Sequence, residues 1–600
     1  MPSCTAWRGS ETTDHMRRKI TPFSLLLLLL LLAACEDPYD TVNDPITYGD
    51  TYLPITLTTH KAVYSPGEKV TFILKEQPSG NLTVRYYHLG TLLEEQPVSG
   101  SEWQWTPPAD DFRGYMAALY ATAGGSEELL QTVAVDVSSD WSRFPRYGFL
   151  SSYGQMSEAQ IGAQIDLLAR YRINGIQFYD WMHDHHRPLA GTPSAPQPTW
   201  PDLMGRTNHL STVKGYIDAA HSKGMKTMFY NLAFGALENA SSDGVSEEWY
   251  LFRDREHSEK DKHHLDAPFR SSIFLTNPGN EEWQTYLAAR HDEVYSVLPF
   301  DGYHIDQLGN RGTLYDYQGN PVDLTQEYPS FIAAMKQAQP EKQLVMNAVS
   351  GYGQEQIATS ATDILYSEVW DETKSYADLA GVITRNDQLS GNSKSTVLAA
   401  YVNYGRSGSS GYVNEPGVLL ANAVIFAFGG AHLELGEHYL ANEYFPNNNL
   451  QMKSSLRQSL LHYYDFMTAY QNLLRDGGEP AVFNVSSADG KITPAPWPAA
   501  QGEVAVTGRT FSNRDVIHLI NFSDAGSMEW RDSNGTQKEP SLVENIALTV
   551  QSRGAVKKVW VASPDHHSGV AESLPFTQQG NAVQFTLPRL KYWEMVVLEY

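Results

Sequence analysis

The chain has 600 residues, and its 44 Lys and Arg against 69 Asp and Glu give a formal net charge of −25. This length exceeds what one hydrophobic core organises, so we expect about three domains. The negative charge disfavours a nucleic-acid partner, because phosphates would be repelled. The two cysteines, Cys4 and Cys35, lie close to the start of the sequence, which excludes disulfides and cysteine-ligated metals from the rest.

An export pattern occupies the first 35 residues. The basic residues 17–19 precede a leucine-rich run that ends in Leu32-Ala33-Ala34-Cys35, which is typical of a signal peptide and resembles a bacterial lipobox. We interpret residues 1–34 as a lipoprotein signal peptide that is cleaved before Cys35, whose sulfur is lipidated, and residues 35–50 as a tether. A transmembrane anchor is disfavoured, because about 15 apolar residues fall short of the roughly 20 that span a bilayer.

The expected location follows from this pattern. We expect an exported protein that is attached by its lipid to the bacterial cell envelope, with the outer membrane preferred and its face left open. The lipid is then the only predicted contact with a membrane.

Residues 51–140 predict an immunoglobulin-like β-sandwich. Turn residues separate the short alternating segments ITLTT, VTFIL, LTVRYYH and YMAALYA, a spacing typical of such sandwiches. Its role is open between a spacer and a sugar-binding module, because Trp103 and Trp105 suit either a core or an exposed platform for sugar.

Residues 141–476 predict a (β/α)8 barrel, because strand patterns alternate with amphipathic helices. Ser157 to Gln160 fit a capping box at the start of the first helix. Eight strands are what such a barrel requires, and their C-terminal ends form the rim on which barrel enzymes build their sites. The predicted strands are 147–153, 175–181, 226–234, 302–309, 343–350, 364–370, 395–404 and 430–437. Residues 477–600 return to alternating patterns and predict an antiparallel C-terminal β domain.

Two of the predicted barrel strands end in an acid. The segment DGYHID ends in Asp306, and ILYSE ends in Glu368. Glycoside cleavage needs one acid to protonate the departing oxygen and one carboxylate to attack carbon or activate water. On strands four and six these acids could face each other across the barrel mouth. Salt bridges and helix caps are the alternative uses of such acids.

A second polar cluster follows the second predicted strand, in QFYDWMHDHHRPL. His183, His185 and His186 lack the i, i+4 spacing of the familiar helical zinc motif. We therefore favour sugar recognition over a structural loop network, and metal binding least. Other polar or aromatic side chains at predicted strand ends are candidates for binding substrate: Asn347, Trp370, Glu434 and Glu437.

Five segments together carry a resemblance to a known family: YGFLSSYG, FYDWMHDHHRPL, DGYHIDQLG, YSEVW and GAHLELGEHYLANEYFPNNNL. They are similar to segments of glycoside hydrolase family 66, the dextranases and cycloisomaltooligosaccharide glucanotransferases, over roughly residues 50 to 600. The resemblance implies that Asp306 is the nucleophile and Glu368 the acid/base. It also implies that Asp180 and Trp181 bind the innermost sugar, and, by motif position alone, that four further residues contact substrate: His185, His186, Glu434 and Glu437.

The sequence therefore predicts an endo-acting, retaining dextranase that cleaves α-1,6-glucosidic links and needs no cofactor or metal. One alternative is a glucanotransferase that closes the bound chain on itself, and another is a surface glycan-binding lipoprotein without turnover. Cyclising members of the family carry a carbohydrate-binding module inserted in the barrel, of about a hundred residues or more. The longest interval here, residues 235–301, is too short for such a module, so we expect hydrolysis.

Overall fold

The computed structural model describes residues 57–76 and 78–600. The predicted signal peptide, the tether and the lipidated Cys35 lie outside the described residues. No helix within the described part of the chain is both long enough and apolar enough to cross a membrane.

Eight parallel strands form the central sheet, in the order β25-β23-β22-β21-β18-β14-β9-β8. Each falls within one of the eight predicted segments, so the predicted barrel is confirmed. Phe149 of β8 pairs with Gly436 just after β25, which joins the two edges of the sheet. The strands are β8 (Tyr147–Leu150), β9 (Gly175–Phe178), β14 (Lys226–Leu232), β18 (Gly302–Asp306), β21 (Gln343–Asn347), β22 (Ile364–Glu368), β23 (Thr396–Ala399) and β25 (Ala431–His432).

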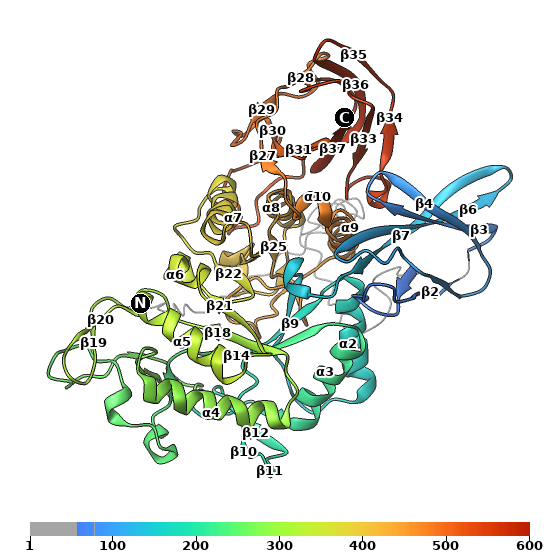
Figure 1. The fold of residues 1–600 in the computed structure, drawn as a ribbon. Coiled ribbons are helices and arrows are strands. Elements are labelled where there is room, and N and C mark those ends of the chain that lie inside the picture. Colours follow the sequence, from blue (N-terminus) through green and yellow to red (C-terminus); the bar gives the residue numbers. More distant parts are fainter. Residues whose placement is uncertain (1–56, 77) are drawn as a thin grey trace, which may run out of the picture. The chain divides into compact units, whose positions relative to one another are not determined.

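A helix follows every barrel strand, and these helices surround the sheet (Figure 1). The predicted capping box is present, since Ser157 and Gln160 satisfy each other's backbone at the start of α2. Each helix then packs its apolar face against the strands. The helices are α2 (Glu158–Arg170), α3 (Leu210–Ser222), α4 (Glu281–Val297), α5 (Leu324–Ala338), α6 (Gln354–Ala358), α7 (Tyr376–Ser390), α8 (Glu415–Ala427) and α9 (Ser454–Ala469), with α10 (Gln471–Leu474) behind α9.

Small hairpins and sheets decorate the loops between the barrel strands. The interval between β14 and β18 holds a three-stranded sheet, two 3-10 helices and α4. The small strands are β10 (Gly191–Thr192), β11 (Ala195–Pro196), β12 (Thr199–Pro201), β13 (Thr207–His209), β15 (Gly235–Ala236), β16 (Lys262–His263), β17 (Ile273–Leu275), β19 (Leu314–Tyr315), β20 (Pro321–Val322), β24 (Gly411–Tyr412) and β26 (Leu450–Gln451).

An antiparallel β-sandwich precedes the barrel. Trp105 is buried and stacks on Tyr86, with ring centroids 4.2 Å apart, while Trp103 stacks on Phe72 at 5.3 Å. Both indoles are therefore engaged in packing. One sheet holds β1 (Leu57–Thr59), β2 (Val70–Leu74) and β5 (Glu102–Trp105), and the other holds β4 (Thr91–Val98), β3 (Asn81–His88), β6 (Arg113–Ala123) and β7 (Ser126–Val137).

The C-terminal region consists of two further sheets. It is antiparallel as predicted, except that β29 (Pro494–Pro496) runs parallel to β30. The larger sheet also holds β27 (Glu479–Pro480), β30 (Val504–Thr510), β31 (Arg514–Asn521), β37 (Trp593–Glu599), β33 (Lys558–Ala562) and β34 (Glu572–Leu574), and the smaller holds β28 (Val485–Ser487), β32 (Val543–Gln551), β36 (Ala582–Leu590) and β35 (Phe576–Gln579).

Helix α9 joins the barrel to the N-terminal sandwich. Its Asp465 accepts the backbone N–H of Ala134 at 3.0 Å and pairs with Arg170 at 2.8 Å. At Gly114 of β6, an added Cβ would lie 1.9 Å from the carbonyl oxygen of Thr468, so only glycine permits this approach. The described residues belong to one compact unit, and domain boundaries at residues 140 and 476 stay predictions.

Candidate active site

Asn347 holds Asp306 and Glu368 together at the C-terminal ends of three adjacent strands. Strand β21 lies between β18 and β22, and each of the three residues is the last of its strand. The Asn347 side-chain N–H donors contact Asp306 Oδ1 at 2.9 Å and Glu368 Oε2 at 3.2 Å. Because one nitrogen reaches both oxygens, these oxygens are at most about 6 Å apart, close enough for both acids to act on one glycosidic bond.

Each carboxylate also accepts a hydrogen bond from its own tyrosine. The Tyr230 hydroxyl donates to Asp306 Oδ2 at 2.8 Å, and the Tyr401 hydroxyl donates to Glu368 Oε1 at 2.6 Å. Charge-assisted bonds of this kind fix the orientation of both acids. Each acid is therefore bonded to a tyrosine of its own and to the shared Asn347.

The environment raises the pKa of both acids above the ordinary values. Burial is the main cause for Glu368, followed by the negative charge of Asp306, and together they raise its pKa to about 7. The pKa of Asp306 is also raised by burial, while the hydrogen bonds from Asn347 and Tyr230 lower it. Near neutral pH Glu368 can thus hold a proton that it can give away.

Aromatic rings line the same end of the barrel. Tyr179 stacks on Phe445 with ring centroids 4.1 Å apart and lies 4.5 Å from Tyr230. Trp370 follows Glu368 in the chain and packs beside Tyr401, with ring centroids 5.5 Å apart. Tyr179 and Trp370 are half-buried, so each keeps part of its ring available to the apolar face of a sugar.

Asp180 follows β9 in a strained conformation. Its φ of 50° is in the left-handed region, which residues other than glycine rarely adopt and which is concentrated at functional sites. Burial is the main reason that its pKa rises to about 7, and the acids Asp202 and Asp306 add to the rise while Arg206 opposes it. Because the charge of Asp306 contributes to this pKa, Asp180 interacts electrostatically with the carboxylate pair.

A loop from the C-terminal region supports the rim next to Glu368. Arg531 donates to the carbonyl of Val369 at 3.0 Å, and its guanidinium lies 5.5 Å from the centre of the Trp370 ring. The neighbouring Trp530 is fully buried and donates to the carbonyl of Thr373 at 2.7 Å. These contacts fix the segment that follows β22.

Three residues that we expected to contact sugar lie in the interior. Trp181 is fully buried and donates to the Tyr230 carbonyl at 3.2 Å. Glu434 is fully buried beneath α8, where Asn422 donates to it at 2.7 Å, and the buried His186 contacts Asp243 at 3.1 Å. Their side chains are used in packing and internal pairing, and their sugar contacts stay predictions.

The other expected binding residues have different surroundings. His185 is buried against Asn231, with Nδ1 2.9 Å from Oδ1, and burial lowers its pKa to about 4. Glu437 accepts the Ser151 hydroxyl at 3.0 Å and the Ser152 N–H at 3.0 Å, across the join between β25 and β8. Sugar contacts remain predictions for these residues and for the three nearer the carboxylate pair: Asp180, Asn347 and Trp370.

Sequence reasoning missed Tyr230, Tyr401 and Arg531. Tyr230 precedes the polar Asn231 near the end of β14, and consecutive strand residues point to opposite faces. Alternate residues of a strand share a face, so this alternation could have indicated that Tyr230 and Asn231 have different surroundings. Arg531 is more than 160 residues from Val369 in the sequence, and no local pattern indicates this contact.

Comparisons with known proteins identify a family and several relatives. A family model described as Glycosyl hydrolase family 66 matches residues 59–597. A cycloisomaltooligosaccharide glucanotransferase of Niallia circulans is 27% identical over 97% of this chain and 76% of its own length. A dextranase of Streptococcus salivarius is 24% identical over 81% of this chain and 67% of its own length. The crystal structure of a Paenibacillus cycloisomaltooligosaccharide glucanotransferase complexed with cycloisomaltoheptaose superposes with a TM-score of 0.83 at 28% identity, covering 90% of this chain and 99% of that chain.

Replacing Tyr401 with Phe is expected to raise the pKa of Glu368. The lost hydrogen bond stabilises the charged carboxylate, so its removal favours the protonated form, by about one pKa unit for a bond to a charged group. The pKa is measured by ¹³C NMR of the labelled glutamate carboxyls, with Glu368→Gln to assign the signal. Tyr404→Phe is the control, because its hydroxyl donates to Glu443 at 2.9 Å. An unchanged or lowered pKa in Tyr401→Phe would contradict the assigned role.

Proposed function

The chain belongs to glycosyl hydrolase family 66, and from this premise we propose that it is a dextranase. It cleaves internal α-1,6-glucosidic links of dextran with retention of configuration and releases isomaltooligosaccharides. The observation that carries the proposal is the shared contact of Asn347 with Asp306 and Glu368. Two acids at that spacing, with one pKa near neutral, are the chemistry that retaining glycosidases need.

In the first step Asp306 attacks the anomeric carbon. Glu368 gives its proton to the departing glycosidic oxygen, so that the new chain end leaves as an alcohol. The covalent glucosyl bond to Asp306 has the β configuration, opposite to that of the substrate. Tyr230 and Asn347 orient the attacking carboxylate through their hydrogen bonds.

In the second step Glu368, now ionised, takes a proton from water while the water oxygen attacks the same carbon. Asp306 leaves as a carboxylate, and the product regains the α configuration. The charge of Asp306 is one cause of the raised pKa of Glu368. Neutralisation of Asp306 in the glucosyl-enzyme removes that cause, which makes Glu368 a stronger acid just when it must be ionised.

Asp306→Gly and Glu368→Gly are expected to lose at least about a thousandfold in kcat on dextran, because each removes a group that acts in the transition state. With a substrate that has an activated leaving group, azide should rescue both variants with different products. Azide replaces the nucleophile in Asp306→Gly and gives a β-glucosyl azide. In Glu368→Gly it attacks the glucosyl-enzyme and gives an α-glucosyl azide.

The control for this experiment is Glu372→Gln. Glu372 is an exposed carboxylate four residues beyond Glu368 that accepts the Ser350 hydroxyl at 3.0 Å, and this variant should keep activity within about twofold. NMR of the isolated azides identifies the anomer. The same anomer from both variants, or rescue of neither, would refute the assigned roles.

The runner-up is a cyclising glucanotransferase, which the names of two relatives favour. The alignment with the Niallia relative extends over 756 positions, more than the 600 residues of this chain, so that relative carries segments that are lacking here. The β14 to β18 interval, the longest in this barrel, is filled by small elements and α4. An inserted module that would guide the far end of the chain back to the site is therefore lacking within it, which favours water as the acceptor.

Digestion of dextran is expected to release linear isomaltooligosaccharides with reducing ends. The products are separated by chromatography before and after treatment with an exo-acting α-1,6-glucosidase, with digests by the two named kinds of relative as standards. Linear products should be degraded to glucose. A dominant product that survives the glucosidase and has no reducing end would move the chain to the cyclising reaction, and no new ends at all would indicate a glycan-binding protein.

We also propose that the protein is anchored in the cell envelope by a lipid on Cys35. The support is the sequence Leu32-Ala33-Ala34-Cys35 behind a basic, leucine-rich segment. Cys35→Ser should release the protein from the membrane fraction of expressing bacteria, because the thiol that takes the lipid is gone. Cys4→Ser is the matched control and should fractionate like the unaltered protein. Retention of Cys35→Ser in membranes would refute the anchor.

A further inference from the structure

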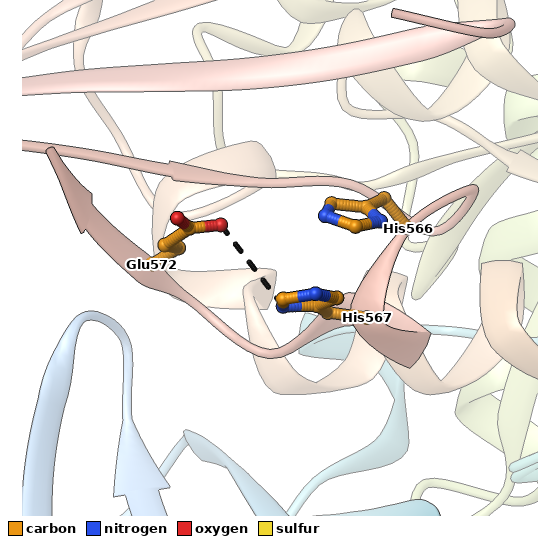
Figure 2. A group of neighbouring side chains, drawn as sticks. All are labelled: His566, His567 and Glu572. Carbon is orange, nitrogen blue, oxygen red and sulfur yellow. Dashed lines mark ion pairs between the residues drawn. The ribbon is translucent and has the colours of Figure 1, made fainter. Parts of the chain in front are cut away.

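A turn in the C-terminal region gathers two histidines and a glutamate. The turn follows β33, contains the short 3-10 helix η6 (His567–Gly569) and ends at Glu572, the first residue of β34. The imidazoles of His566 and His567 and the Glu572 carboxylate point toward one another (Figure 2). One possible ligand atom from each residue lies within 4.8 Å of the others.

The backbone of the turn is unusual. His567 and Ser568 have φ values of 47° and 48°, so two successive residues other than glycine adopt the left-handed region. The ring centroids of His566 and His567 are 3.8 Å apart. Strain of this kind persists only where the surroundings hold it, and it is concentrated at ligand sites.

Hydrogen bonds to neighbouring elements hold the turn in place. Buried Asp565 accepts the backbone N–H of Trp593 at 2.8 Å and the Tyr463 hydroxyl at 3.1 Å. The Thr132 hydroxyl donates to the Ser568 carbonyl at 2.9 Å, and the Tyr470 hydroxyl donates to the Gly569 carbonyl at 2.7 Å. The turn is therefore ordered without a ligand, which reduces the entropy that a bound ion would have to overcome.

The carboxylate of Glu572 is paired with a side chain that can itself be a metal ligand. Among the described residues, the ion-pair partner of Glu572 is His567, at 4.0 Å, and the nearby Arg589 is paired with Glu544 at 3.2 Å.

From the geometry of this turn we propose that His566, His567 and Glu572 bind a divalent transition-metal ion of the Zn²⁺ class. Imidazole nitrogen and carboxylate oxygen are the ligands that such ions take, at about 2.1 Å, so ligand atoms in a tetrahedral site are about 3.4 Å apart. The ligand atoms here lie within 4.8 Å of one another. His567 is exposed and Glu572 half-buried, so rotation of these two side chains can bring the atoms to the shorter distance. Water completes the coordination.

A second group of possible ligands is less suited to a metal. It consists of Asp184, His186 and Asp243. Arg270 pairs with Asp184 at 2.6 Å, and Arg187 pairs with Asp243 at 2.8 Å. Both carboxylates are thus already neutralised by a guanidinium, whereas Glu572 has no Lys or Arg partner among the described residues.

The test uses the full protein after treatment with a chelator. Competition with a zinc-sensitive dye measures stoichiometry and affinity, and thermal unfolding measures the rise in Tm with added Zn²⁺. The unaltered protein should bind one equivalent and gain Tm. His567→Ala and Glu572→Gln should each lose at least about tenfold in affinity and most of the Tm gain, because each removes one of three ligands. Their activity on dextran should be unchanged, which shows that both fold.

His264→Ala is the matched control. His264 is also exposed and lies 3.1 Å from an acid, Asp266, but it belongs to no group of three ligands among the described residues, so the variant should bind Zn²⁺ like the unaltered protein. Absence of Zn²⁺ binding in the unaltered protein would overturn the proposal. Equal binding by His567→Ala, or loss of the equivalent only in Asp243→Asn, would overturn it as well.

Discussion

The site depends on keeping two carboxyl groups close together while partly shielding them from water. Burial raises the pKa of both acids, and the charge of Asp306 raises that of Glu368 further. Two negative charges at this distance repel each other, so one acid keeps its proton more readily than the other. Asn347 makes the arrangement possible, because its amide donates to both oxygens from the strand between them. The geometry follows from the sheet itself, because β18, β21 and β22 are adjacent and parallel.

The C-terminal region supports the site in a way that its separate β pattern does not suggest. The segment after β22 is bound by Arg531 and Trp530, and Asp532 accepts the side-chain N–H of Asn414 at 2.7 Å. Trp370 lies on this bound segment, directly after the acid/base candidate. Rigid support of this kind preserves the orientation on which proton transfer depends. The C-terminal region is therefore part of the structure of the catalytic rim.

The sequence was sufficient for the barrel and for placing Asp306 and Glu368 at strand ends, since strand periodicity and strand ends are local properties. The sequence was insufficient where the role of a side chain depends on the face of the strand to which it points. Asn231 and Tyr230 are adjacent, yet Asn231 bonds to the His185 backbone behind the strand while Tyr230 reaches Asp306. The family resemblance implies that Trp181 binds sugar, and the sequence does not indicate that its indole is buried. Arg531 could not be found, because only the folded chain brings it to Val369.

The aromatic composition is another feature from which the role of a side chain cannot be predicted. Flat rings suit sugars and also suit cores, and the structure uses most of them in the core. Trp105, Trp181, Trp530 and Trp593 are buried, whereas Trp370 remains half-exposed beside Glu368. A ring can bind sugar only if part of its face is left open and a polar group nearby can fix the hydroxyls. Of these five tryptophans, Trp370 alone meets both conditions.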